Sequence, residues 1–269
     1  MTANPRDVLT RPAPEPDFTV RYGAHPDHVA DVRLPPGDAD GPLVVFVHGG
    51  FWRAEFDRRH TAPLAADLAE RGYPVATVEF RRTGQEGGGW PGTFTDVADA
   101  VTRVPRLVGA ALADRGRAVP DLTRPILAGH SAGGHLALWA AGTTGLPVRG
   151  VLALAPVADL ALAHRLDLDG GAVATLLGGG PDEVPDRYAA ADPMRLLPLT
   201  VPAVVVHGTA DDRVPVEVGR SYVAAARAAG DDVTLVELPE TEHFAVIDPR
   251  SAAWSSVLDA LAALRHRAG

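Results

Sequence analysis

Runs of consecutive apolar residues recur along the chain, separated by segments in which apolar positions are spaced differently. Leu43 to Val47 is the first long run, and it ends at His48-Gly49-Gly50. Similar runs follow at 75–80, 125–128, 148–154, 201–206 and 233–238. A short, continuous apolar run is typical of a parallel strand that is buried on both faces. These segments are therefore predicted to be strands of one central sheet.

Segments with helical spacing lie between the predicted strands. One of them spans 94–108, although Pro105 should kink a helix there. A final helix is expected to begin at Asp248-Pro249, since this pair resembles a cap followed by a first-turn proline. The alternation predicts the α/β fold class, with a mostly parallel central sheet and helices on both faces.

Two parts of the chain do not follow the alternation of strands and helices. Residues 18–22 and 28–34 are β-rich and precede a Pro-Pro-Gly turn, which predicts an edge hairpin. Residues 159–200 are rich in Gly, Pro and Asp, with helical pieces near 172–177 and 194–197, and we interpret them as a cap or lid over the site. A length of 269 residues suits one α/β domain, so residues 1–269 are expected to form a single domain.

Net charge and the distribution of apolar residues limit the classes of partner that the protein is expected to bind. A formal net charge of −9 argues against a nucleic-acid surface, because phosphate binding requires clustered basic residues. The first 17 residues are polar and proline-rich, and no apolar stretch reaches the roughly 18 residues of a membrane span. We therefore expect a cytoplasmic protein without nucleic-acid or membrane partners. A homodimer stays an alternative to a monomer.

The absence of certain residue types limits the chemistry. There is no cysteine, and all 25 basic residues are arginine, which excludes a thiolate nucleophile, a lysine Schiff base and a Ser-Lys dyad. Asn4 and Gln85 are the only residues of their types. A catalytic histidine would therefore need a carboxylate or a backbone carbonyl to orient it.

The sharpest motif is G-x-S-x-G at 129–133, between a predicted strand and a predicted helix. A nucleophile on such a tight turn has a strained backbone, and glycines on either side remove side chains that would clash. Ser131 is therefore the predicted nucleophile, with its hydroxyl exposed at the start of a helix. An incidental serine in a glycine-rich turn is the less favoured alternative.

Serine needs a base, and His243 follows the last predicted strand, where a loop can bring it over the strand ends. We expect His48, His130 and His207 to be structural. Asp211 and Asp212 both follow a late strand and are candidates for the acid that orients the base. The order nucleophile, acid, base along the chain is the one typical of α/β-hydrolases.

Acyl transfer also requires donors for the oxyanion of the tetrahedral intermediate. The glycine loop at 48–52 follows a buried strand, and its backbone at Gly49, Gly50 and Phe51 can approach a substrate closely. The N–H of Ala132, next after the nucleophile, is the expected second donor.

These motifs together resemble the α/β-hydrolase esterases of the kynurenine formamidase (arylformamidase) and feruloyl-esterase-like group. The resemblance runs from about residue 30 to the end and rests on HGGFW, GHSAGGHLAL, HGTADDRVP and EHF. It implies that the HGG-x-W loop holds the oxyanion, that Asp211 is the acid rather than Asp212, and that His243 is the base.

The sequence thus predicts a serine hydrolase that cleaves a small carboxylic ester or aryl formamide through an acyl-enzyme. A peptidase, or an acyl transferase or lyase, on the same triad is the alternative, and a noncatalytic receptor for a small molecule is a third. No metal site is predicted, because no H-E-x-x-H stretch occurs and His130 and His135 are not spaced i, i+4. No cofactor is expected either. Four aromatic residues are candidates for the substrate pocket: Trp52, Trp90, Phe94 and Phe244.

Overall fold

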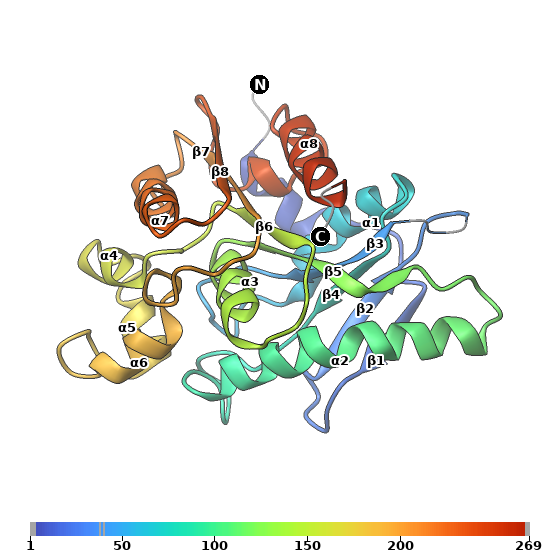
Figure 1. Ribbon diagram of the computed structural model, residues 1–269, viewed down its shortest axis with the longest axis horizontal. Helices are drawn as coiled ribbons and strands as arrows, with labels where there is room; N and C mark the ends of the chain where they lie inside the picture. Colours follow the sequence, from blue (N-terminus) through green and yellow to red (C-terminus); the bar gives the residue numbers. More distant parts are fainter. Residues whose placement is uncertain (1–3, 38, 40, 267–269) are drawn as a thin grey trace.

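The computed structural model describes residues 4–37, 39 and 41–266, and its centre is one sheet of eight strands (Figure 1). The strands follow one another across the sheet in the order β1-β2-β4-β3-β5-β6-β7-β8. Their bounds are Phe18–Arg21 for β1, Val29–Arg33 for β2, Pro42–Val47 for β3, Val75–Val78 for β4, Asp121–His130 for β5, Gly150–Leu154 for β6, Ala203–Gly208 for β7 and Val233–Leu238 for β8. Every predicted strand is present.

In the order of the sheet, the strands from β4 to β8 are all parallel, whereas β2 is antiparallel to both of its neighbours, β1 and β4. The expected hairpin of β1 and β2 is confirmed, but β1 alone lies at the edge, because β2 also pairs with β4. All residues of β3, β4, β6 and β7 are buried. This burial explains their continuous apolar runs.

Helices cover both faces of the sheet, as predicted. In β3, Leu43, Val45 and Val47 pack into the core on one face, whereas Val44 and Phe46 pack into the core on the other. The first core is closed by α2 (Gly92–Asp114), α3 (Ala132–Thr143) and α7 (Val216–Ala228). The second is closed by α1 (Ala62–Glu70) and α8 (Trp254–Arg265), which Figure 1 shows across the sheet from α2 and α3.

Two helices differ in detail from their prediction. α2 continues through Pro105 as one element, and its bounds extend beyond the predicted 94–108 at both ends. The last helix does not begin at Asp248-Pro249: α8 begins at Trp254, after the short 3-10 helix η4 (Ala245–Ile247). The carboxylate of Asp248 accepts a hydrogen bond from Arg250 N at 2.8 Å and pairs with Arg11, so it stabilises a turn rather than a helix start.

Residues 159–200 connect β6 to β7 through short helices: α4 (Leu160–Arg165), α5 (Ala172–Leu177), α6 (Pro185–Ala191) and the 3-10 helix η3 (Pro193–Arg195). In Figure 1 these elements lie together beside α3 and α7. Two further 3-10 helices, η1 (Pro5–Thr10) and η2 (Arg58–Thr61), contact each other on the side of the second core. Within the described ranges, no helix is long and apolar enough to cross a membrane.

Candidate active site

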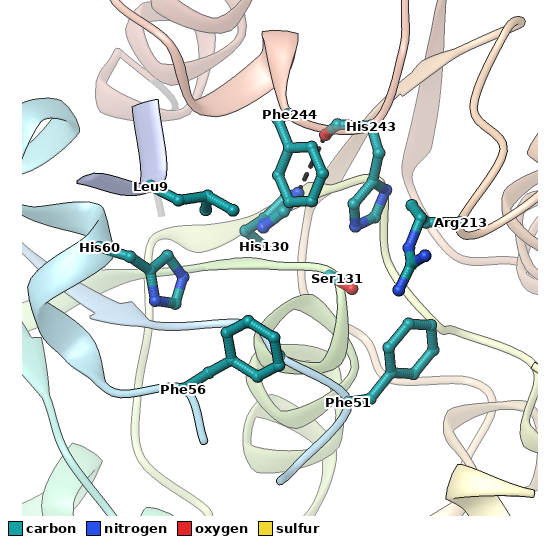
Figure 2. Close-up of a pocket in the computed structure, with 10 residues that line it drawn as sticks. Leu9, Phe51, Phe56, His60, His130, Ser131, Arg213, His243 and Phe244 are labelled. Carbon is teal, nitrogen blue, oxygen red and sulfur yellow. Dashed lines mark hydrogen bonds between the residues drawn. The ribbon is translucent and has the colours of Figure 1, made fainter. Parts of the chain in front are cut away.

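The motifs found in the sequence meet at the carboxyl ends of the parallel strands. The loop after β3 carries Gly50 and Phe51, the turn after β5 carries Ser131, and the segment after β8 carries His243. Together they face a pocket of about 40 Å³ that opens to solvent (Figure 2). The lining residues are Leu9, Gly50, Phe51, Phe56, His60, His130, Ser131, Arg213, His243 and Phe244.

Ser131 occupies the strained turn that its motif predicts. Its φ of 56° and ψ of −121° lie outside the ordinary regions for a residue with a side chain. The chain passes so close to itself here that only glycine fits on either side. A Cβ at Gly129 would lie 2.2 Å from the carbonyl oxygen of Gly133, and one at Gly133 would lie 2.0 Å from that of Val47.

The hydroxyl of Ser131 is not exposed as expected. The residue is only 1% exposed, and it is one of the residues that line the pocket. Two segments distant in sequence line the same pocket: η1 contributes Leu9, and the loop before η2 contributes Phe56 (Figure 2). A nucleophile in this position meets a substrate only inside the pocket.

The structure brings Asp211, not Asp212, to His243. Oδ2 of Asp211 lies 2.6 Å from Nδ1 of His243, and both side chains are buried. Asp212 is exposed, although it follows directly in the chain. The resemblance implied Asp211 rather than Asp212 as the acid, and the position of Asp211 beside His243 agrees with that choice.

Asp211 is held in its charged form. Burial acts to raise the pKa of its carboxyl, but hydrogen bonds from His207 and His243 outweigh burial and keep the pKa well below its usual range. Oδ1 accepts further hydrogen bonds from the backbone N–H groups of Arg213 at 2.9 Å and Val214 at 2.8 Å. A charged carboxylate of this kind can fix the tautomer of the imidazole beside it.

Ser131 and His243 lie on the wall of the same pocket (Figure 2). The described residues include no hydrogen bond between the two side chains, a situation common in enzymes without a bound substrate. His130 packs against His243 with ring centroids 4.5 Å apart, and its Nε2 lies 3.1 Å from the carbonyl oxygen of His243. His130 therefore supports the position of His243, as its predicted structural role requires.

The loop after β3 approaches the turn of Ser131 with unusual backbone angles. Gly50, Phe51 and Trp52 have φ values of 110°, 48° and 57°. A Cβ at Gly49 would lie 3.1 Å from Cβ of Ser131, so glycine permits this approach. Within the described ranges, the N–H groups of Gly50, Phe51 and Ala132 donate to no backbone carbonyl. Gly50 and Phe51 line the pocket, whereas Gly49 and Ala132 are not among its lining residues.

A buried ionic network supports this loop. Nδ1 of His48 lies 2.8 Å from the carbonyl oxygen of Gly49, and Nε2 lies 2.8 Å from Oε1 of Glu79. Burial acts to raise the pKa of Glu79, but His48 and Arg82 outweigh it and lower the pKa to about 2. The sequence predicted a structural His48 but gave no role to Glu79, whose only signal was its place at the end of a predicted strand.

Three of the four aromatic candidates do not line the pocket. Trp52 and Phe94 are buried in the core beneath the first face of the sheet, and the partly buried Trp90 packs against that core. The left-handed backbone at 51 and 52 directs Phe51 into the pocket and leaves Trp52 buried at 1% exposure, edge-on to His135. Phe244 lines the pocket, as predicted.

Four lining residues were missed: Leu9, Phe56, His60 and Arg213. None belongs to 159–200, so the segment interpreted as a lid contributes nothing to the pocket wall. Its contact with the site is through Asp169, which pairs with Arg213. As for metals, the described part of the chain contains no group of three or more His, Asp or Glu side chains that could hold an ion.

Known proteins share this architecture. The family model described as BD-FAE matches residues 30–225, which is more than half of the chain. The probable carboxylic ester hydrolase LipM of Mycobacterium tuberculosis is 26% identical over 84% of this chain, and the chain spans 56% of LipM. A kynurenine formamidase of Danio rerio is 25% identical, with 85% of this chain and 75% of that protein covered.

Among solved structures, Esterase B from Lactobacillus Rhamnosis superposes with a TM-score of 0.78 at 18% identity, covering 97% of this chain and 89% of its own. This level of identity supports the fold alone, since one fold carries many functions. The family match extends over the glycine loop, the turn of Ser131 and Asp211. The chain therefore belongs to the BD-FAE family, has the α/β-hydrolase fold and resembles the arylformamidase-like esterases.

Proposed function

We propose that the protein hydrolyses small carboxylic esters through a covalent acyl-enzyme on Ser131. The observation that carries the proposal is the buried pair of Asp211 and His243, with 2.6 Å between Oδ2 and Nδ1, on the wall of the pocket that contains Ser131. A nucleophile, a base and an acid that orients the base are the elements that this chemistry requires.

In the first half of the reaction, Oγ of Ser131 attacks the ester carbonyl carbon and gives its proton to Nε2 of His243. The oxyanion that forms accepts hydrogen bonds from backbone N–H groups of the glycine loop and of Ala132. The carbon–oxygen bond to the alcohol then breaks, and His243 returns the proton to the departing alcohol. Ser131 is left as an ester of the acyl group.

In the second half, water takes the place of the alcohol. His243 accepts a proton from the water as its oxygen attacks the acyl carbon, and the proton passes to Oγ when the acyl–serine bond breaks. The carboxylic acid leaves and the resting enzyme is restored. Throughout both halves, the charged Asp211 stabilises the imidazolium of His243.

The pocket and the relatives support a small carboxylic ester. Leu9, Phe51, Phe56 and Phe244 supply apolar walls, and a cavity of only about 40 Å³ limits the size of the substrate. LipM is named a probable carboxylic ester hydrolase. Aryl formamides are a second candidate class, because kynurenine formamidases align with 85% of this chain.

The test is a series of 4-nitrophenyl esters with acyl groups from acetyl to octanoyl, together with an aryl formamide. We expect the highest kcat/KM for short acyl groups and a decline as the chain outgrows the pocket. An initial burst of nitrophenol equal to the enzyme concentration would report the acyl-enzyme when its hydrolysis is slow. No turnover of any ester or formamide would contradict the proposal.

A further inference from the structure

The pocket wall carries one side chain with a permanent charge. Arg213 is the only arginine among the lining residues of the described chain, and none of those residues is a carboxylate. Its side chain is 35% exposed, which makes the guanidinium accessible to a ligand. Figure 2 shows it beside the ring of His243 and above Phe51, on the side toward Ser131.

The carboxylate nearest to this guanidinium is already engaged by another arginine. Oδ2 of Asp169 lies 2.6 Å from Nε of Arg53, and Nη2 of Arg53 also donates to the carbonyl oxygen of Asp169 at 2.5 Å. Nη2 of Arg213 reaches the other oxygen, Oδ1, at 3.3 Å. One negative charge thus faces two positive charges, and Arg53 has the shorter contacts.

The other two carboxylates nearby do not neutralise Arg213. Asp211 directs its oxygens to His243 and to backbone N–H groups, including that of Arg213 itself at 2.9 Å. Asp212 is exposed and, within the described ranges, forms no ion pair with Arg213. The guanidinium has five N–H donors. Within the described ranges, only Nη2 donates a hydrogen bond, and its acceptor is Oδ1 of Asp169.

We propose that Arg213 makes the active site selective for esters that carry a carboxylate or a comparable anionic group close to the scissile bond. The inference rests on the proposed ester hydrolysis. A planar guanidinium binds a carboxylate through two parallel hydrogen bonds, and such charge-assisted bonds are stronger than neutral ones. The apolar wall of the pocket excludes part of the water that would otherwise screen the pair.

Matched pairs of esters test the selectivity. On the alcohol side, 4-acetoxybenzoate is compared with its methyl ester, which is neutral. On the acid side, mono-4-nitrophenyl glutarate is compared with 4-nitrophenyl pentanoate, after subtraction of spontaneous hydrolysis. We expect kcat/KM to favour the anionic member of at least one pair by about tenfold or more, in line with the strength of hydrogen bonds to charged groups. The preference should decrease as salt is added.

Three variants should move this ratio in different directions. Arg213→Gln removes the guanidinium and should lower the ratio of anionic to neutral kcat/KM about tenfold. Arg53→Gln should also lower it, because Asp169 would then pair with Arg213 alone. Asp169→Asn should raise it, because it frees Arg213. Arg220→Gln is the matched control, since Arg220 is an exposed arginine that pairs with Glu237 and lines no part of the pocket.

Charge selection predicts that Arg53→Gln lowers the ratio of anionic to neutral kcat/KM and that Asp169→Asn raises it. A general loss of structure would change the ratio in the same direction in both variants. The inference is overturned if the wild-type enzyme prefers the neutral member of both pairs. It is also overturned if Arg213→Gln leaves the ratio unchanged, or if Asp169→Asn lowers it. Failure to cleave any ester, charged or neutral, would instead overturn the proposed function.

Discussion

Oδ2 of Asp211 lies 2.6 Å from Nδ1 of His243, whereas the neighbouring carboxylate of Asp212 is exposed. The two residues are adjacent in the chain and identical in type, so they offer a matched comparison. The fold buries one of them beneath the base and leaves the other outside.

Asp211→Asn should therefore be far more damaging than Asp212→Asn. An amide at 211 favours the wrong tautomer of His243, and a loss of up to about 10⁴-fold in kcat is typical of such a change. Asp212→Asn should stay within about twofold of wild type, since it alters only a surface charge. Steady-state kinetics on one nitrophenyl ester measure both variants. Equal losses would show that Asp211 does not orient the base.

Glu79→Gln tests whether the network beneath the glycine loop positions the oxyanion donors. The variant keeps the shape of the side chain but removes the charge that faces His48, whose Nδ1 lies 2.8 Å from the carbonyl oxygen of Gly49. Removal of one oxyanion donor lowers kcat about 10²- to 10³-fold, so a displaced donor should lower kcat roughly tenfold to a hundredfold. KM should change little.

Asp31→Asn is the control for this variant, because Asp31 pairs with Arg58 but does not contact His48. It should disturb the same ionic network without reaching the loop. A Glu79→Gln enzyme with normal kcat and a raised KM would contradict a role in positioning the donors. A fall in thermal stability that is similar in both variants would be expected from the loss of buried ion pairs.

The buried His135 should make the protein less stable in acid. Burial lowers its pKa from 6.5 to about 4. Between these values the unfolded chain binds a proton that the folded chain does not, so stability is full above pH 6.5 and is lost as the pH falls toward 4. The slope contributed by one such group is at most about 1.4 kcal/mol per pH unit.

His135→Gln should remove this contribution while keeping a donor for the carbonyl oxygen of Ala191, which lies 3.0 Å from Nε2. Urea unfolding at several pH values between 4 and 6.5 measures the slope in both proteins. The variant should be less stable at neutral pH and should lose less stability on acidification. Identical slopes would contradict the prediction.

The reaction should not require a metal ion. His243 supplies the base and the backbone supplies the oxyanion donors, so neither role calls for a Lewis acid. Activity should be unchanged after exhaustive dialysis against EDTA. Loss of activity that zinc or manganese restores would contradict the serine mechanism, because a metal-bound water is the alternative nucleophile in such enzymes.

The sequence predicts the parts of the site that depend on local rules. Ser131 is identified by glycines that the tight turn requires, and His243 and the pair Asp211 and Asp212 by strands whose ends meet at one edge. The resemblance to the arylformamidase-like esterases then selects Asp211 over Asp212. The strands themselves are visible because both faces of the sheet are covered, which leaves uninterrupted apolar runs.

What the sequence does not predict depends on contacts between distant segments. Leu9 and His60 reach the pocket from the 3-10 helices η1 and η2 on the side of the second core, and nothing in the local sequence pattern of either residue indicates this position. Trp52 belongs to the HGGFW motif yet packs into the core, because Phe51 and Trp52 both have a left-handed backbone that turns the chain. Asp248 pairs with Arg11, 237 residues away, and accepts a hydrogen bond from Arg250 N in the turn that precedes α8.

The most direct test of the central claim is covalent labelling of the intact enzyme with a fluorophosphonate, followed by mass spectrometry of its peptides. The serine mechanism predicts one adduct per chain, on Ser131, with ester turnover lost in proportion to labelling. It also predicts that Ser131→Ala folds normally, takes up no label and loses about 10⁴-fold or more in kcat. A Ser131→Ala enzyme that keeps more than about a tenth of wild-type activity would contradict the account, because removal of a triad serine lowers kcat by far more than tenfold.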